Sequence, residues 1–245
     1  MQGDMLTKTQ AVVLRTVKYG ENKLIVDLLT EKEGRVSCAI SIAKTQRGKL
    51  KKQFFQPLTI LEVELDIRPR QQLHHLRDAR LGVPFSSLPF DARKLSISLF
   101  LAEFIYYCTR DEQQNALLYR YVANSLEWLD QCADDFANFH LVFMMRLSQF
   151  VGFAPNVDDY REDCLFDLRA ASFTTVTPLH PDFLSAADAS HINTLLRMNY
   201  GSMHLFRMSH DDRNRIVEVI IRYYRLHIPA FPELRSLEVV KALWR

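Results

Sequence analysis

The sequence has few cysteines and no long apolar run, and both absences narrow what the chain can be. No stretch of about 18 consecutive apolar residues occurs, so neither a transmembrane helix nor a membrane partner is predicted. The N-terminus lacks the basic and then apolar segments of a signal peptide, which predicts a cytoplasmic location. The four cysteines form no CxxC pair, so they fit neither a zinc site nor a disulfide framework. We expect buried free thiols in a reducing compartment at Cys38, Cys108, Cys132 and Cys164.

The sequence also lacks the motifs that carry catalysis, because it contains no GxSxG, GxxxxGK[ST] or HExxH segment. His74 and His75 are adjacent, so on a strand they face opposite sides and do not share a metal. Adjacent acidic pairs lie at predicted helix ends or in loops, where they act as caps or solvated charge: Asp134-Asp135, Asp158-Asp159 and Asp211-Asp212. The sequence therefore predicts no enzyme, no metal and no cofactor, with an acidic-residue nuclease as the enzymatic alternative.

What the sequence does have is an uneven distribution of charge. Residues 1–82 hold 15 Lys and Arg against 9 Asp and Glu, whereas residues 83–245 hold 16 against 20. The small net charge of +2 thus conceals a basic first part and an acidic second part. A concentrated excess of positive charge favours a polyanionic partner for the first part of the chain.

Apolar alternation in the first part indicates short β-strands. Large apolar residues recur at every second position in 36–42 and in 60–67. Three more segments are rich in β-branched and aliphatic residues: 12–17, 24–29 and 73–81. Five short strands in this length predict a small barrel over residues 1–83, with the OB-fold as the leading topology and an SH3-like barrel as the competitor.

Beyond Pro84 the periodicity becomes helical, which predicts an all-helical domain over 84–245 and an α+β chain. Asp91 is a candidate N-cap for a first helix whose apolar stripe includes Leu95 and Leu99. Further helices are predicted at 116–129, 139–151, 186–198, from Ser209 to about Ile228, and at 234–244. A hairpin insertion is predicted at about 155–181.

A basic loop between two predicted strands is the strongest local signal. Residues 44–52 contain five basic side chains and no acid, and Phe54 and Phe55 follow at once. Cations that follow phosphates beside aromatic rings that stack on bases are typical of single-strand binding. The alternative is a solvated loop with both phenylalanines in the core. The candidate nucleic-acid-binding residues are Arg15, Lys18, Lys44, Arg47, Lys49, Lys51, Lys52 and Arg70.

The last predicted helices combine basic side chains with an apolar face. These cations are Arg222, Arg225, Arg235 and Lys241. Such a surface can be a groove for an acidic peptide with an apolar tip, or simply the face of an amphipathic bundle.

Several segments in register resemble the bacterial RecO recombination mediators. They are the opening Thr9 to Asn22, the segment Leu28 to Val36, the basic loop, the helix end Leu147 to Asn156, and the C-terminal segments 223–228 and 234–237. Many RecO proteins carry paired cysteines as a zinc knuckle after the helix end, whereas only Cys164 lies nearby here. We therefore expect the hairpin to lack a zinc knuckle and to be held by packing of Phe166, Leu168, Phe173 and Val176.

The resemblance implies a non-catalytic protein that works on DNA. Proteins similar to RecO bind single- and double-stranded DNA, anneal complementary strands and help load recombinase onto strands coated by single-strand-binding protein. The implied partners are RecR-like and RecF-like proteins and the acidic C-terminal tail of single-strand-binding protein, with Arg222 and Arg225 as candidates for the tail's carboxylates. The implied location is the nucleoid. The alternative is a protein–protein adaptor whose barrel does not bind nucleic acid.

Overall fold

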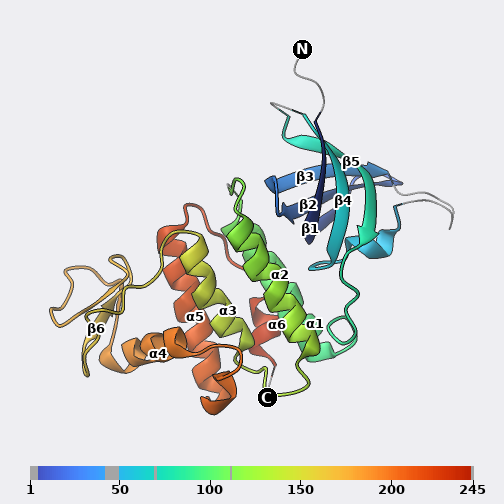
Figure 1. Ribbon diagram of the computed structural model, residues 1–245. Helices are drawn as coiled ribbons and strands as arrows, with labels where there is room; N and C mark the ends of the chain where they lie inside the picture. The colour runs from blue at the N-terminus through green and yellow to red at the C-terminus, as the bar shows by residue number, and fades with distance from the viewer. Residues whose placement is uncertain (1–4, 42–49, 69–70, 111, 244–245) are drawn as a thin grey trace. The chain divides into compact units, whose positions relative to one another are not determined.

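Two compact units make up the chain, Met1–Gln131 and Cys132–Arg245. The computed structural model describes residues 5–41, 50–68, 71–110 and 112–243 (Figure 1). The transition from strands to helices falls near residue 84, whereas the compact units divide between Gln131 and Cys132. The first two helices therefore belong to the same unit as the strands.

A closed five-stranded barrel forms the first part of the first unit (Figure 1). Its strands are β1 (Met5–Lys18), β2 (Lys23–Thr30), β3 (Gly34–Ser41), β4 (Ile60–Ile67) and β5 (Leu73–Leu81). Their order around the barrel is β1-β2-β3-β5-β4, and β4 also pairs with β1. All neighbours are antiparallel except β3 and β5. This order confirms the OB-fold topology and excludes the SH3-like alternative.

The barrel interior is filled by the alternating apolar residues of the strands, including Val13, Val26 and Leu61. Phe55 joins this core from the short 3₁₀ helix η1 (Lys52–Phe55). A bulge between Val13 and Arg15 shifts the register of β1 on β2. As a result, Arg15, Asp27 and Ser37 are register partners across three successive strands.

Two helices, α1 (Ala92–Cys108) and α2 (Ala116–Gln131), complete the first unit. Asp91 caps α1 as predicted, because its side chain accepts hydrogen bonds from the backbone N–H groups of Arg93 and Lys94. The predicted apolar stripe of α1 was partly wrong, since Leu95 and Leu99 are 41% and 44% exposed. Apolar residues occur on nearly every side of α1, so their spacing does not define the buried face.

A hydrogen-bond network fastens the segment after the barrel to the end of α2. The Asp130 carboxylate accepts hydrogen bonds from the backbone N–H groups of Ser86, Ser87 and Leu88 at 2.7–2.9 Å. The buried Lys94 ammonium donates to Ser87 Oγ and to the Asp130 carbonyl oxygen. These bonds hold residues 86–88 in one conformation at the start of the helical region.

The second unit is built on α3 (Phe139–Phe150), α4 (Ala186–Arg197), η2 (Met203–Leu205), α5 (His210–His227) and α6 (Leu237–Lys241). Ser209 and Asp212 form a capping box at the start of α5. Gly152 follows α3 with φ +90°, a conformation that favours glycine after a helix end. The last helix is shorter than the predicted 234–244. Leu237 N donates to the Leu234 carbonyl oxygen in a turn, and the α-helical bond from Val240 N is accepted at Ser236.

The predicted hairpin is part of a three-stranded sheet with the order β7-β6-β8. Its strands are β6 (Leu165–Asp167), β7 (Ser172–Thr174) and β8 (Phe183–Leu184). Phe166, Leu168 and Phe173 are buried as expected, but Val176 is 73% exposed because β7 already ends at Thr174. Arg169 instead forms an ion pair with Asp182, and His180 Nε2 lies 3.3 Å from Asp167 Oδ2.

The cysteines are all free thiols. Cys38, Cys108 and Cys164 are buried, whereas Cys132 is partly exposed at the start of the second unit, so the expectation of four buried thiols was wrong for Cys132. Burial raises the pKa of Cys38 to about 12. Within the residues that the structure describes, no helix is both long and apolar enough to cross a membrane.

Candidate nucleic-acid interface

Exposed cations gather at the hairpin between β1 and β2. Arg15 and Lys18 lie on β1, Lys23 begins β2, and all three are exposed. The hairpin is closed by a 2.9 Å hydrogen bond from Tyr19 N to the Lys23 carbonyl oxygen, and the Tyr19 ring is 64% exposed. This hairpin therefore presents positive charge beside an accessible aromatic ring.

The short helix η1 lies beside the same strand. Thr16 Oγ1 donates a 2.7 Å hydrogen bond to the Phe55 carbonyl oxygen, which fastens η1 to β1. Lys51 and Lys52 are exposed at the start of η1. The structure thus brings two described cations of the predicted basic loop to the strand that carries Arg15.

Four predicted nucleic-acid-binding residues fall outside the described residues, namely Lys44, Arg47, Lys49 and Arg70. The two phenylalanines after the loop differ in their surroundings. Phe55 is 2% exposed within the barrel core, so the prediction that it stacks on bases was wrong. Phe54 is half-buried against that core and lines an apolar groove. Stacking by Phe54 stays a prediction.

A buried guanidinium at the start of β3 was not anticipated from the sequence. The Arg35 side chain is 9% exposed, and its Cζ lies 4.3 Å from the centroid of the Tyr106 ring of α1. Arg15 approaches the same ring, with its Cζ 5.0 Å from the centroid and its Nη1 donating to Tyr106 Oη at 2.9 Å. One tyrosine therefore holds two cations from different strands.

Electrostatics around Arg35 are unfavourable for its own charge. Burial lowers the pKa of Arg35, and the positive charges of Arg110 and Arg15 lower it further. Asp27 acts in the opposite direction, with its carboxylate 3.7 Å from the Arg35 guanidinium. No sequence signal could have found this cluster, because residues 35 and 106 are far apart in the chain and are brought together only by the packing of α1.

The position of Arg35 is fixed by its backbone. Gly34 has φ +66°, and Arg35 N donates a 3.1 Å hydrogen bond to the Glu112 carbonyl oxygen in the connection between α1 and α2. A Cβ at Gly34 would lie 2.3 Å from the Gln113 carbonyl oxygen. The turn between β2 and β3 is therefore in backbone contact with this connection.

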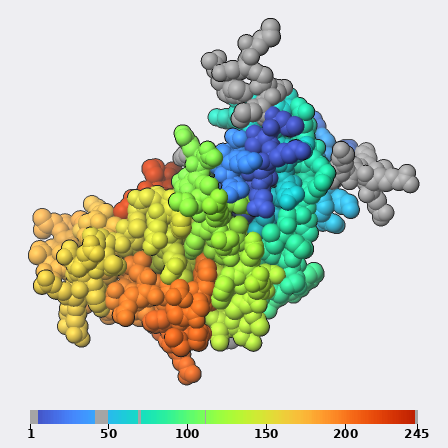
Figure 2. Space-filling model, viewed as in Figure 1, coloured from blue at the N-terminus to red at the C-terminus, as the bar shows by residue number. Residues whose placement is uncertain are grey.

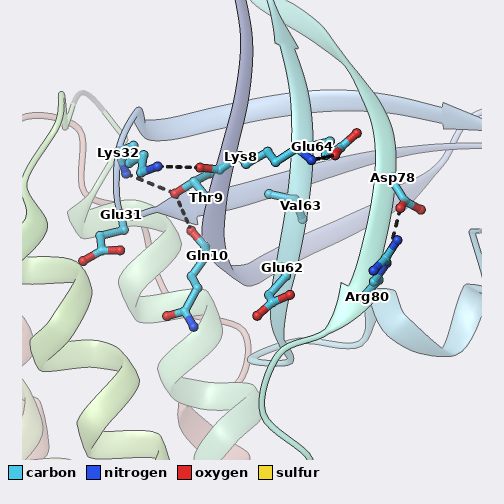
Figure 3. Close-up of a pocket in the computed structure, with 10 residues that line it drawn as sticks. All are labelled: Lys8, Thr9, Gln10, Glu31, Lys32, Glu62, Val63, Glu64, Asp78 and Arg80. Carbon is cyan, nitrogen blue, oxygen red and sulfur yellow. Dashed lines mark hydrogen bonds and ion pairs between the residues drawn. The ribbon is translucent and has the colours of Figure 1, made fainter.

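A different part of the barrel surface is lined by acids. Figure 2 shows β1 in dark blue beside β4 in cyan. A pocket of about 360 Å³ lies there, and Figure 3 draws the residues that line it. Two of its three cations are paired with carboxylates, because Lys8 contacts Glu64 at 2.6 Å and Arg80 contacts Asp78 at 3.5 Å (Figure 3). The third, Lys32, donates a hydrogen bond to the Lys8 carbonyl oxygen. With Glu31 and Glu62 also lining the pocket, carboxylates outnumber cations, which disfavours a polyanion at this place.

The two arginines predicted to bind a partner are on α5. Arg222 Nη2 donates 2.8 Å hydrogen bonds to Asp182 Oδ1 and to the Pro181 carbonyl oxygen, so it is bonded to the segment around β8. Arg225 makes a long contact of 3.5 Å with the Pro232 carbonyl oxygen. Arg225 is therefore held less firmly than Arg222, and the role of both in binding a partner stays a prediction.

Comparison with known proteins assigns the chain to a family. The family described as "Recombination protein O N terminal" matches residues 3–85, and "Recombination protein O C terminal" matches residues 89–238. The chain belongs to the RecO family. Its relatives include DNA repair protein RecO of Phocaeicola vulgatus, 47% identical over 240 residues, and DNA repair protein RecO of Bacteroides fragilis, 44% identical over 241 residues. In both cases, the match covers 98% of this chain and 100% of the relative.

Membership confirms the resemblance found in the sequence and places the chain among proteins of DNA repair and recombination. DNA repair protein RecO of Flavobacterium psychrophilum, at 28% identity over 242 residues, shows that the similarity extends along the whole chain in more distant relatives. Among the residues that the structure describes, no group of three or more His, Cys, Asp or Glu side chains is arranged to hold a metal ion.

Proposed function

We propose that this RecO-family chain is a non-catalytic recombination mediator. It binds single- and double-stranded DNA through the basic side of its barrel, anneals complementary strands, and helps load recombinase onto strands coated by single-strand-binding protein. The observation that carries this proposal is the grouping of exposed Arg15, Lys18, Lys23, Lys51 and Lys52 around β1. Carboxylates gather elsewhere on the barrel, around the pocket of Figure 3.

Annealing requires that two repelling backbones be neutralised without reading their sequence. Cations on a barrel surface meet this need, because each Lys or Arg that contacts a phosphate displaces a counterion whatever the base. A helix lying in a groove would add base specificity that annealing does not use. The exposed cations around β1 therefore suit this task better than a groove-reading element would.

The helical part of the chain is proposed to dock other proteins. RecR-like and RecF-like proteins and the acidic tail of single-strand-binding protein are the proposed partners. Arg225 is the better candidate for a carboxylate of the tail, since Arg222 already bonds Asp182. A chain with these partners would be found with the nucleoid.

The proposal is tested by strand annealing on bare strands and on strands coated by single-strand-binding protein. The wild type should accelerate annealing on both, and its affinity for single strands should fall steeply with salt. Lys51→Ala/Lys52→Ala should lower the salt slope by about 0.7 for each lost phosphate contact. The double variant Lys8→Ala/Arg80→Ala removes equal charge from the acid-lined pocket and serves as the matched control.

A flat salt response, or no acceleration of annealing by the wild type, would contradict the proposal. Retention of a partner protein without any retention on immobilised single-stranded DNA would instead identify an adaptor. Clean cleavage of labelled DNA with Mg²⁺ or Mn²⁺ would contradict the non-catalytic assignment.

A further inference from the structure

Three arginines, from β1, from β3 and from the turn after α1, converge beside one pair of tyrosines. Arg15 of β1 and Arg35 of β3 both lie within 5.0 Å of the Tyr106 ring centroid. Arg110 follows α1, and its Cζ lies 5.8 Å from the Tyr107 ring centroid. The two rings meet edge to face with centroids 4.9 Å apart. Like charges are therefore gathered where the barrel meets the end of α1.

Within the part of the chain that the structure describes, the charge of Arg35 is neutralised incompletely. Asp27 is the carboxylate that lies against Arg35, but at 3.7 Å it is beyond hydrogen-bonding distance. Its Oδ1 already accepts a 2.5 Å hydrogen bond from Ser37 Oγ. Arg15 and Arg110 also act on Arg35 as like charges, and this repulsion costs stability unless an anion joins them.

Arg35 has hydrogen-bond donors that lack an acceptor among the described residues. Its Nε and Nη1 are buried and have no hydrogen-bond partner in the described part of the chain. Such unpaired donors are rare in folded proteins and call for an explanation, since each costs free energy. Stacking on Tyr106 offsets part of the cost of burying the charge, but Nε and Nη1 still lack an acceptor among the described residues.

We propose that Arg15, Arg35 and Arg110 form, around Tyr106, a phosphate-binding site through which the end of α1 joins the barrel in holding a nucleic-acid backbone. This inference rests on the proposed function and names a site for it. Arg15 and Arg110 are exposed, and their planar guanidinium groups match the two oxygens of a phosphodiester. Arg35 supplies fixed positive charge beneath them.

Continuity with the β1–β2 hairpin favours a polymer over a small free anion. Arg15 lies on the same strand as Lys18, and Lys23 begins the next strand of the hairpin. The phosphates bound at the hairpin and at Arg110 then belong to one nucleic-acid strand. That strand crosses from the barrel onto the helical region of the same unit. The nucleic-acid interface thus includes a residue beyond the barrel.

The test compares Arg15→Ala, Arg110→Ala and their combination with the matched controls Lys8→Ala and Arg80→Ala. A fluorescently labelled single-stranded oligonucleotide is titrated at several salt concentrations, and the melting temperature of each protein is recorded. Each arginine variant should bind about fivefold to tenfold more weakly, and its slope of log K against log salt should fall by about 0.7. The two controls should bind like the wild type.

Stability separates a binding role from a structural one. Removing Arg15 or Arg110 relieves repulsion on Arg35, so the variants should melt no lower than the wild type. A lower melting temperature with unchanged DNA affinity would overturn the inference and assign the cluster to folding. If both arginine variants keep the wild-type slope while Lys51→Ala/Lys52→Ala lowers it, the inference fails and the proposed function stands. If the wild type does not bind the oligonucleotide at low salt, both fail.

Discussion

The Cβ position of Gly34 lies 2.3 Å from the carbonyl oxygen of Gln113, so the turn between β2 and β3 is in backbone contact with the connection between α1 and α2. This contact has no room for a side chain. Because Gly34 also has φ +66°, a substitution there meets a steric clash and a strained backbone together.

Gly34→Ala should therefore destabilise the protein strongly. We expect a loss of about 3 kcal/mol in the free energy of unfolding, the sum of a left-handed alanine and an overpacked contact. Gly20→Ala is the matched control, because Gly20 has φ +76° but nothing lies within 4 Å of its Cβ position. It should cost about 1 kcal/mol, measured by denaturant titration. Equal losses in the two variants would contradict the role of the Gln113 contact.

Asp130 should stabilise the chain in a pH-dependent manner. Its backbone hydrogen bonds from Ser86, Ser87 and Leu88 outweigh the opposing effect of burial and hold the pKa of Asp130 below its ordinary value. A carboxyl with a lowered folded-state pKa contributes stability that is complete above its unfolded pKa and is lost as pH falls through the folded value. Asp130→Asn should therefore melt lower than the wild type at pH 7, and the difference should shrink below about pH 4. A difference that stays constant with pH would contradict this account.

Substitutions of Phe54 and Phe55 should affect different properties, DNA affinity in the first case and folding stability in the second. Phe55 is buried in the barrel core, so Phe55→Ala should cost about 3–5 kcal/mol in the free energy of unfolding. Phe54 is half-buried, so Phe54→Ala should leave a folded protein in which any loss of single-strand affinity reports a stacked base. Fluorescence titration against a single-stranded oligonucleotide measures it. Unchanged affinity for Phe54→Ala would remove stacking by Phe54 from the proposal.

Arg222 and Arg225 should respond differently to substitution. Arg222 bonds Asp182 and the Pro181 carbonyl oxygen, so Arg222→Ala should loosen the segment around β8 and speed hydrogen exchange there. Arg225→Ala should leave that exchange unchanged and should weaken binding of an acidic peptide that ends in apolar residues. If Arg225→Ala binds such a peptide like the wild type, Arg225 does not hold its carboxylates.

Thiol reactivity should single out Cys132. It is partly exposed, whereas Cys38, Cys108 and Cys164 are buried. DTNB added to the folded protein should modify one thiol rapidly, and the other three only after unfolding, because buried thiols are shielded from the reagent. Burial also raises the pKa of Cys38 and of Cys108, so these two form little thiolate. Cys132→Ser should abolish the fast phase. A fast phase that persists in this variant would show that a second thiol is accessible.

The strands were predictable from the sequence where apolar and charged residues alternate regularly along the strand. Segments 60–67 and 73–81 were predicted with the bounds that the structure has, because apolar and charged residues take turns along β4. The first half of β1 was missed, since Thr7 and Thr9 are buried there and polar residues hide the alternation. In α1 the reverse holds, because apolar residues occur on most sides and give no preferred face.

The candidate site was predictable only in its local part. Charge counting identified Arg15 and Lys18, which are exposed on β1. Arg35 could not be found in the same way, because its surroundings depend on Tyr106 and on the backbone of Glu112, both in the helical region. A guanidinium that is buried by a distant helix looks like an ordinary basic residue in the sequence.

The parallel pairing of β3 with β5 has a consequence for how the chain is made. β3 ends at Ser41, whereas its partner β5 begins only at Leu73. The free edge of β1 likewise pairs with β4, which follows later in the chain. While the ribosome synthesises the chain from its N-terminus, β1, β2 and β3 emerge as a meander with two open edges. The meander becomes a barrel only when residues up to Leu81 are available. Until then, the growing chain exposes unpaired strand edges that can pair with other chains and aggregate.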